Sequence, residues 1–174
     1  MRNLRPIPVL LLFSLLACAE LGKEACEQGD WLTIGQRDGS LGRGGEYVER
    51  HVGNCAKYDI GVDRDLWEQG RQQGLRVFCT PQSQYQAGRD GKPFNEICAE
   101  ENLPVHREAY DKGRKYYTLT RRIEMLRAEI SDLRRDALAS SDPRTSLAGA
   151  ELKAFMLRMD IDILLRERQK YESP

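Results

Sequence analysis

The strongest constraint on the fold of this chain is its set of five cysteines, because their pairing would staple one part of the 174 residues together. The cysteines are Cys18, Cys26, Cys55, Cys79 and Cys98. In an oxidising compartment, the cysteines of a small exported domain pair as disulfides, and an odd count leaves one cysteine over. The first question is therefore which cysteine stands apart from the others.

The N-terminal segment has the features of a secretory signal. Arg2 and Arg5 form a basic start, and a short apolar run follows over residues 7–17. This run is too short to cross a bilayer as a helix, which takes about 20 residues. A basic start followed by a short apolar run is typical of a segment that is removed during export.

The end of this segment resembles a bacterial lipobox, with the sequence Leu15-Leu16-Ala17-Cys18. The resemblance implies that residues 1–17 are a lipoprotein signal peptide and that Cys18 becomes the lipidated first residue. The next residue, Ala19, is not aspartate, and by the same resemblance this implies the outer membrane of a Gram-negative cell, on its periplasmic face. The alternative is an ordinary signal peptide that happens to contain a cysteine.

If Cys18 is lipidated, an even set of four cysteines remains, and we expect two disulfides. Four cysteines allow three pairings. We favour the neighbour pairs Cys26–Cys55 and Cys79–Cys98, because short loops close most readily. The alternative is a metal site, but the sequence has no closely spaced cysteine pair and offers only His51 near Cys55. Structural zinc sites use tighter paired spacings, so we expect no metal.

The composition excludes several classes of function. Lysine plus arginine equals aspartate plus glutamate at 27 each, so no net positive field attracts nucleic acid. The mean hydropathy of -0.61 excludes a polytopic membrane protein. Nucleotide-binding, zinc-protease and serine-hydrolase motifs are absent from the sequence. We expect no enzyme and no cofactor, with an envelope hydrolase as the minor alternative. Of the two histidines, we expect His51 to pack beside a disulfide and His106 to be exposed to solvent.

A short unit recurs in the middle of the chain, in which an aromatic residue is followed by glycine and then by Arg or Gln. The units are Trp31–Gly35–Gln36, Trp67–Gly70–Arg71, Tyr85–Gly88–Arg89 and Tyr110–Gly113–Arg114. On a helix, such a glycine leaves a notch into which another helix can pack closely, although helix C-caps also explain glycines of this kind.

The arginines of these units are candidate ligand-binding residues. Arg71, Arg89 and Arg114 could bind carboxylates of peptidoglycan or lipid phosphates. The alternative is that each arginine pairs with a nearby acidic side chain.

The C-terminal part reads as two helices. Apolar residues alternate by three and four positions along two stretches that are separated by Ser140–Pro143. The first seam is Tyr116, Leu119, Ile123, Leu126, Ile130, Leu133 and Ala137, and the second is Leu152, Met156, Met159 and Ile163. This pattern predicts a coiled-coil-like antiparallel hairpin.

These observations predict a mostly α fold. After the signal, residues 18–25 form a tether, residues 26–115 a glycine-rich, disulfide-stapled domain of short helices, and residues 116–174 the helical hairpin. Strand signals are poor, because no run of four β-branched residues occurs.

The disulfide-stapled region contains a specific set of cysteines, glycines, aromatic and polar residues. They are Cys26, Asp30, Trp31, Gly35, Asp38, Gly39, Gly42, His51, Cys55, Gly70, Gly74, Phe78, Cys79, Thr80, Pro81, Tyr85, Gly88, Gly91, Cys98, Ala109, Tyr110 and Gly113. In these residues and their spacing, the region resembles a proteobacterial lipoprotein family known as domain of unknown function 2799 (DUF2799). The resemblance implies an envelope lipoprotein with cysteine bridges and implies no activity.

The function that we expect from the sequence is structural. The protein would be anchored to the membrane by lipid and would bind an envelope protein or a second copy of itself through the hairpin. The alternative is a module that binds a small ligand or a glycan such as peptidoglycan through the aromatic–Gly–Arg units.

Overall fold

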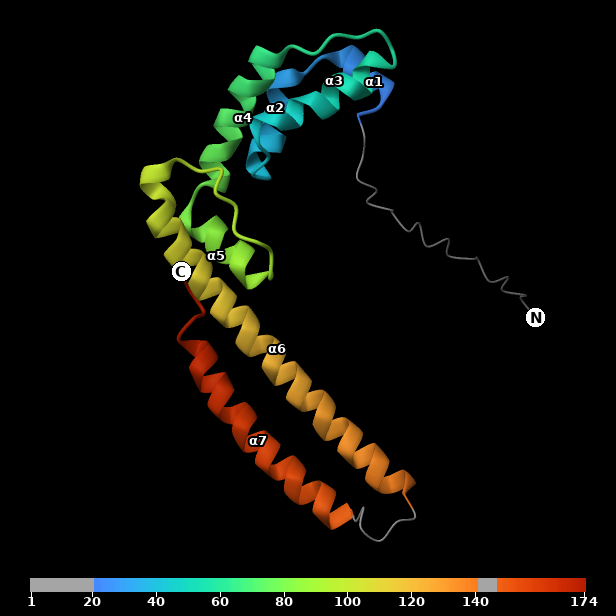
Figure 1. Cartoon of the computed structure of the whole chain (residues 1–174), viewed down its shortest axis with the longest axis vertical. Helices are drawn as coiled ribbons and strands as arrows, with labels where there is room; N and C mark the ends of the chain where they lie inside the picture. Colours follow the sequence, from blue (N-terminus) through green and yellow to red (C-terminus); the bar gives the residue numbers. More distant parts are fainter. Residues whose placement is uncertain (1–20, 141–146) are drawn as a thin grey trace, which may run out of the picture.

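The computed structural model describes residues 21–140 and 147–174 (Figure 1). The described residues form α-helices and two short 3-10 helices without a strand, which confirms the mostly α prediction. The elements are α1 (Lys23–Gln28), α2 (Trp31–Ser40), η1 (Gly45–Tyr47), α3 (Val48–Ala56), α4 (Arg64–Phe78), α5 (Pro81–Arg89), η2 (Glu100–Asn102), α6 (Leu103–Ala139) and α7 (Leu147–Gln169). None of these helices has both the length and the apolar character needed to cross a bilayer.

Helices α2 and α4 cross with their backbones in direct contact. A Cβ atom added at Gly35 would lie well inside van der Waals contact of the Trp67 carbonyl oxygen on α4. The reverse holds for Gly70, whose added Cβ would strike the Leu32 carbonyl oxygen on α2. Because only glycine leaves room for this approach, these glycines form the helix-packing notch and are not C-caps.

Helices α5 and α6 repeat the same arrangement. Gly88 on α5 lies against the Tyr110 carbonyl oxygen, and Gly113 on α6 lies against the Tyr85 carbonyl oxygen. The cysteine spacing repeats as well. Cys26 and Gly35 are as far apart in the sequence as Cys79 and Gly88, and Cys55 and Gly70 are as far apart as Cys98 and Gly113. The two crossings are thus two versions of one disulfide-stapled helix pair.

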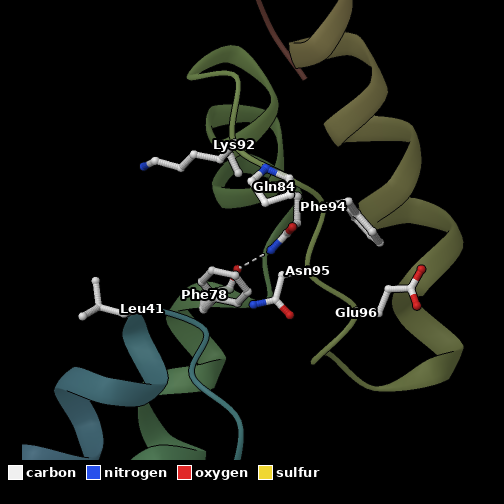
Figure 2. Close-up of a pocket in the computed structure, with 9 residues that line it drawn as sticks. Leu41, Phe78, Gln84, Lys92, Phe94, Asn95 and Glu96 are labelled. Carbon is white, nitrogen blue, oxygen red and sulfur yellow. Dashed lines mark hydrogen bonds between the residues drawn. The ribbon is translucent and has the colours of Figure 1, made fainter. Parts of the chain in front are cut away.

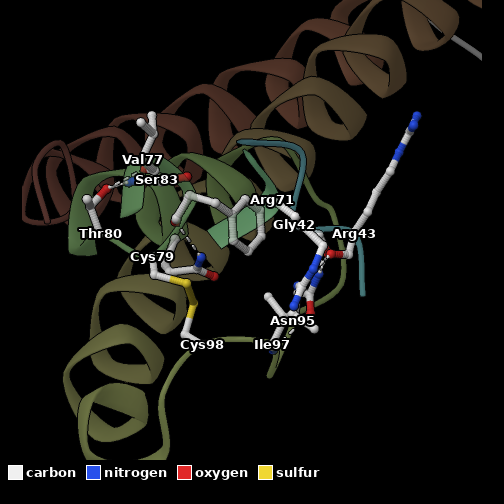
Figure 3. Close-up of a disulfide and its surroundings, with 12 residues drawn as sticks. Gly42, Arg43, Arg71, Val77, Cys79, Thr80, Ser83, Asn95, Ile97 and Cys98 are labelled. Atoms are coloured by element: carbon white, nitrogen blue, oxygen red, sulfur yellow. Dashed lines mark hydrogen bonds between the residues drawn. A yellow bond between two sulfur atoms is a disulfide. The ribbon is translucent and has the colours of Figure 1, made fainter. Parts of the chain in front are cut away.

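The structure contains the two neighbour disulfides that the loop-length argument favours. Cys26 in α1 is bonded to Cys55 in α3, and Cys79 after α4 is bonded to Cys98 before η2, each with a Cα–Cα distance of 5.6 Å. Figure 3 shows the second bridge beside the start of α5, where the Thr80 hydroxyl accepts a hydrogen bond from the Ser83 amide at 3.1 Å. The Thr80 N-cap and Pro81 in the first helical position together begin α5.

The long helix α6 packs against α7 along its C-terminal part. The contacts run in opposite chain directions, from the Arg134–Glu151 ion pair at one end to the Arg168–Thr120 hydrogen bond at the other. Figure 1 shows the two helices side by side, extending away from the N-terminal helices. The core between them is apolar and contains Ile123, Leu126, Ile130, Ala154 and Ile161. The seam predicted for α6 therefore faces α7.

Helix α6 is continuous across residues 115 and 116, where the sequence analysis placed a domain boundary. Its first turns belong to the glycine crossing and its later turns to the pair with α7, so one rigid element joins the two regions. At the other end of the pair, the Tyr85 hydroxyl donates a hydrogen bond of 2.6 Å to the Tyr171 carbonyl. The chain after α7 is thereby attached to α5.

Candidate interaction surface

The predicted lipidation site, Cys18, and the predicted signal peptide over residues 1–17 lie outside the described residues. The four disulfide cysteines are all placed, and Cys26, Cys55 and Cys98 are buried. With both bridges formed, none of these four sulfurs is a free thiol, so they offer no nucleophile.

Arg71 is buried at the α2–α4 crossing and already has partners. Its Nε and Nη2 groups donate to the Glu68 carboxylate, each at 2.7 Å, and its Nη1 group donates to the Arg43 carbonyl at 3.2 Å. The hydrogen bonds with Glu68 raise the pKa of Arg71 and lower that of Glu68. All three guanidinium nitrogens of Arg71 thus donate a hydrogen bond within the protein.

Arg89 and Arg114 lie at the other crossing and stack on tyrosines. The Arg89 guanidinium is 4.1 Å from the centre of the Tyr116 ring, and its Nη2 donates to the Tyr116 hydroxyl at 3.1 Å. The Arg114 guanidinium is 5.2 Å from the centre of the Tyr117 ring. Arg71 belongs to a different helix pair, so the three arginines do not form one site.

Asp38 is fully buried and connects three helices and a loop. One carboxylate oxygen accepts hydrogen bonds from His51 Nε2 at 2.6 Å and Trp67 Nε1 at 2.9 Å. The other oxygen accepts from Arg43 Nη1 at 2.7 Å. Burial alone would raise the pKa of Asp38, but the hydrogen bonds from His51 and Trp67, with the charge of Arg43, lower it below its ordinary value. An ionised Asp38 therefore joins α2, α3, α4 and the loop after α2.

The Asp38 cluster resembles a catalytic dyad only in residue types. His51 Nδ1 is buried and has no hydrogen-bond partner among the described residues, so no nucleophile stands beside it. The sulfur of Cys55, four residues further along α3, is held in a disulfide. His51 is buried and bonded to Asp38, one helical turn from the disulfide cysteine Cys55. The expectation for His106 is wrong, because this side chain is only 4% exposed.

A cavity of about 490 Å³ lies between the end of α2, the α4–α5 junction and residues 92–96 (Figure 2). Gln84 lies in its wall and donates a hydrogen bond of 3.1 Å to the Phe78 carbonyl, while its Oε1 is buried and has no hydrogen-bond partner in the described part of the chain. The charged residues at the rim are paired, Lys92 with Asp90 and Glu96 with Arg107. None of the three candidate arginines lines this cavity.

Helix α7 exposes a line of large apolar side chains, which we call the outer stripe. Its members are 53–65% exposed. They are Leu152, Phe155, Met156, Met159 and Ile163.

This exposure corrects the sequence analysis, which placed Leu152, Met156, Met159 and Ile163 inside the hairpin. The residues that contact α6 instead lie on the opposite side of α7 and include Ala154, Leu157 and Ile161. Both lines follow steps of three and four residues, and small Ala154 lets α7 approach α6 closely.

Part of the chain matches a known protein family. Residues 30–115 match the family described as Protein of unknown function (DUF2799). This region is a DUF2799 domain. It contains the Asp38 cluster and both glycine crossings, and it ends within α6. The chain matches no curated protein and no solved structure. The outer stripe lies beyond the DUF2799 domain, on the part of the chain that the family model does not cover.

Proposed function

We propose that this protein is a lipid-anchored lipoprotein of the Gram-negative outer membrane that faces the periplasm and binds another protein through the outer stripe. The observation that carries the proposal is the exposure of five large apolar side chains along one face of α7. Isolated exposed apolar residues are normal, but a continuous line of them is typical of a binding surface.

The arrangement of α7 strengthens this argument. A helix that is apolar on two sides is stable when both sides are covered, and α6 covers only one of them. The DUF2799 domain supplies a rigid base for this surface, because α6 runs from the glycine crossing into the pair with α7 without a break. The DUF2799 domain would therefore support and position the stripe.

The lipobox and the disulfides support the proposed location. Lipidation of Cys18 accounts for the odd cysteine, and the other four are joined in two bridges that belong in an oxidising compartment. The glycan-binding alternative is less favoured here, because Arg71 is bonded to Glu68 and lies at a different helix crossing from Arg89 and Arg114, so the three arginines do not form one site. We therefore propose a binding role without catalysis.

Photo-crosslinking in intact cells tests the binding surface. A photo-reactive phenylalanine analogue replaces Met159 in the full chain, and in a matched control it replaces Val105, which is equally exposed on α6 outside the stripe. We expect a protein adduct from position 159 and none from position 105. Absence of an adduct from position 159 would contradict the proposal that the outer stripe binds a protein.

Labelled palmitate tests the anchor. The full chain expressed in a Gram-negative host is expected to incorporate the label and to fractionate with the outer membrane. The Cys18→Ser variant is expected to do neither. Equal labelling of the two proteins would contradict the lipoprotein assignment.

A further inference from the structure

We infer that the partner of the outer stripe is a second copy of this chain, with the two α7 helices packed against each other in antiparallel directions. This inference rests on the proposed function, because it names the partner of the same surface. It follows from the spacing of the stripe and from the charges beside it.

The stripe is complementary to itself. Leu152, Met156, Met159 and Ile163 alternate by steps of four, three and four residues, which is the spacing of a two-helix seam. A two-fold axis between Met156 and Met159 places Met156 opposite Met159 of the second copy. The same axis places Leu152 opposite Ile163 of the second copy. The two central pairs are methionines, whose flexible side chains adapt well to an interface.

The charges beside the stripe select the antiparallel direction. Lys153 and Asp160 lie on the same side of the stripe, and both are exposed. In an antiparallel pair, equal sides of the two helices meet, so Lys153 faces Asp160 of the second copy, and the reverse contact forms by symmetry.

A parallel pair is disfavoured by two other charged residues beside the stripe. In that arrangement opposite sides of the two helices meet, and Asp162 would face Glu167 of the second copy. Like charges at the edge of an interface oppose association and thereby set the orientation of the partners. Lys153 also forms an ion pair with Glu129 of α6 at 3.0 Å, so the test needs a control variant in which only this contact within the chain is removed.

A charge exchange tests the inference with two differently tagged full chains expressed in the same cells. In the Lys153→Glu variant, the new glutamate of each copy would face Asp160 of the other, and these two like-charge contacts would weaken self-association. In the Asp160→Lys variant, the new lysine of each copy would face Lys153 of the other, with the same effect. When the two variants are mixed, both contacts are again between opposite charges. We expect about tenfold more mixed than like pairs after tag purification, because each exposed pair changes binding only a few-fold.

The controls separate charge complementarity from damage to the fold. Glu129→Gln removes the contact within the chain and is expected to leave self-association unchanged. Circular dichroism of each variant is expected to match that of the unaltered protein. A variant that loses helix is replaced by the milder Lys153→Gln or Asp160→Asn, for which we expect a smaller loss of self-association.

The failures of the two proposals are distinguishable. If the position-159 adduct contains a different protein and no second copy, or if mixed pairs are no more abundant than like pairs, the antiparallel self-association is refuted while the binding surface stands. If position 159 gives no adduct, both proposals fail. A position-159 adduct with the mass of two chains, together with the preference for mixed pairs, supports both.

Discussion

Replacing Asp38 by alanine removes the acceptor for three hydrogen bonds. Two of the donors, His51 Nε2 and Trp67 Nε1, belong to buried side chains and would be left without a partner. Each buried, unsatisfied donor costs about 1–3 kcal/mol. The third donor, Arg43, is about a third exposed and can turn to water, so it adds little. We therefore expect a loss of about 4 kcal/mol in the free energy of unfolding.

Urea denaturation with the disulfides intact measures this loss. The two tryptophans, Trp31 and Trp67, are both buried in the region that Asp38 holds together, so their fluorescence reports on its unfolding. Asp38→Asn keeps an oxygen acceptor and should lose about half as much. The matched control Asp65→Ala alters an exposed aspartate of α4 and should change stability by less than about 0.5 kcal/mol. A loss below about 1 kcal/mol for Asp38→Ala would refute the structural role of the cluster.

Three further predictions concern the same domain. Gly35→Ala places a methyl group against a carbonyl oxygen of α4 and should cost about 2 kcal/mol or more, whereas Gly53→Ala, which meets no atom within 4 Å, should be neutral or stabilising in urea denaturation. The paired change of Cys79 and Cys98 to serine should cost about 3 kcal/mol in thermal unfolding, and an unchanged melting temperature would contradict the stapling role. The pKa of Asp38 is lower in the folded protein than the ordinary aspartate value of 3.8, so its contribution to stability is fully present above pH 3.8 and is lost as the pH falls through the folded pKa. Acid titration followed by tryptophan fluorescence should show this loss of stability. The Asp38→Asn variant should show a flatter dependence of stability on pH.

Local signals in the sequence predict much of the fold. Asp63 and Thr80 cap the helices that they precede, because each side chain accepts a hydrogen bond from a free amide in the first turn. The neighbour disulfides follow from the lengths of the loops that they close. The glycine notches follow from the recurrence of an aromatic residue and a glycine at helical spacing, a pattern that depends only on local sequence.

The parts that sequence analysis missed depend on contacts between distant segments. Asp38 precedes a glycine and reads as a turn residue, but its partners His51 and Trp67 come from two other helices. His106 is buried by packing that no local pattern records. On α7, two apolar lines have the same spacing. The line that contains Ala154 faces α6, because the small alanine side chain allows the two helices to approach closely. Residue size is therefore the sequence signal that could have predicted which apolar line is buried.

The bond between the Tyr85 hydroxyl and the Tyr171 carbonyl has a mechanical consequence. It lies at the opposite end of the helix pair from the Arg134–Glu151 ion pair, so the two contacts together hold α7 in one register against α6. A load applied to α7 is then transmitted to α5 as well as to α6.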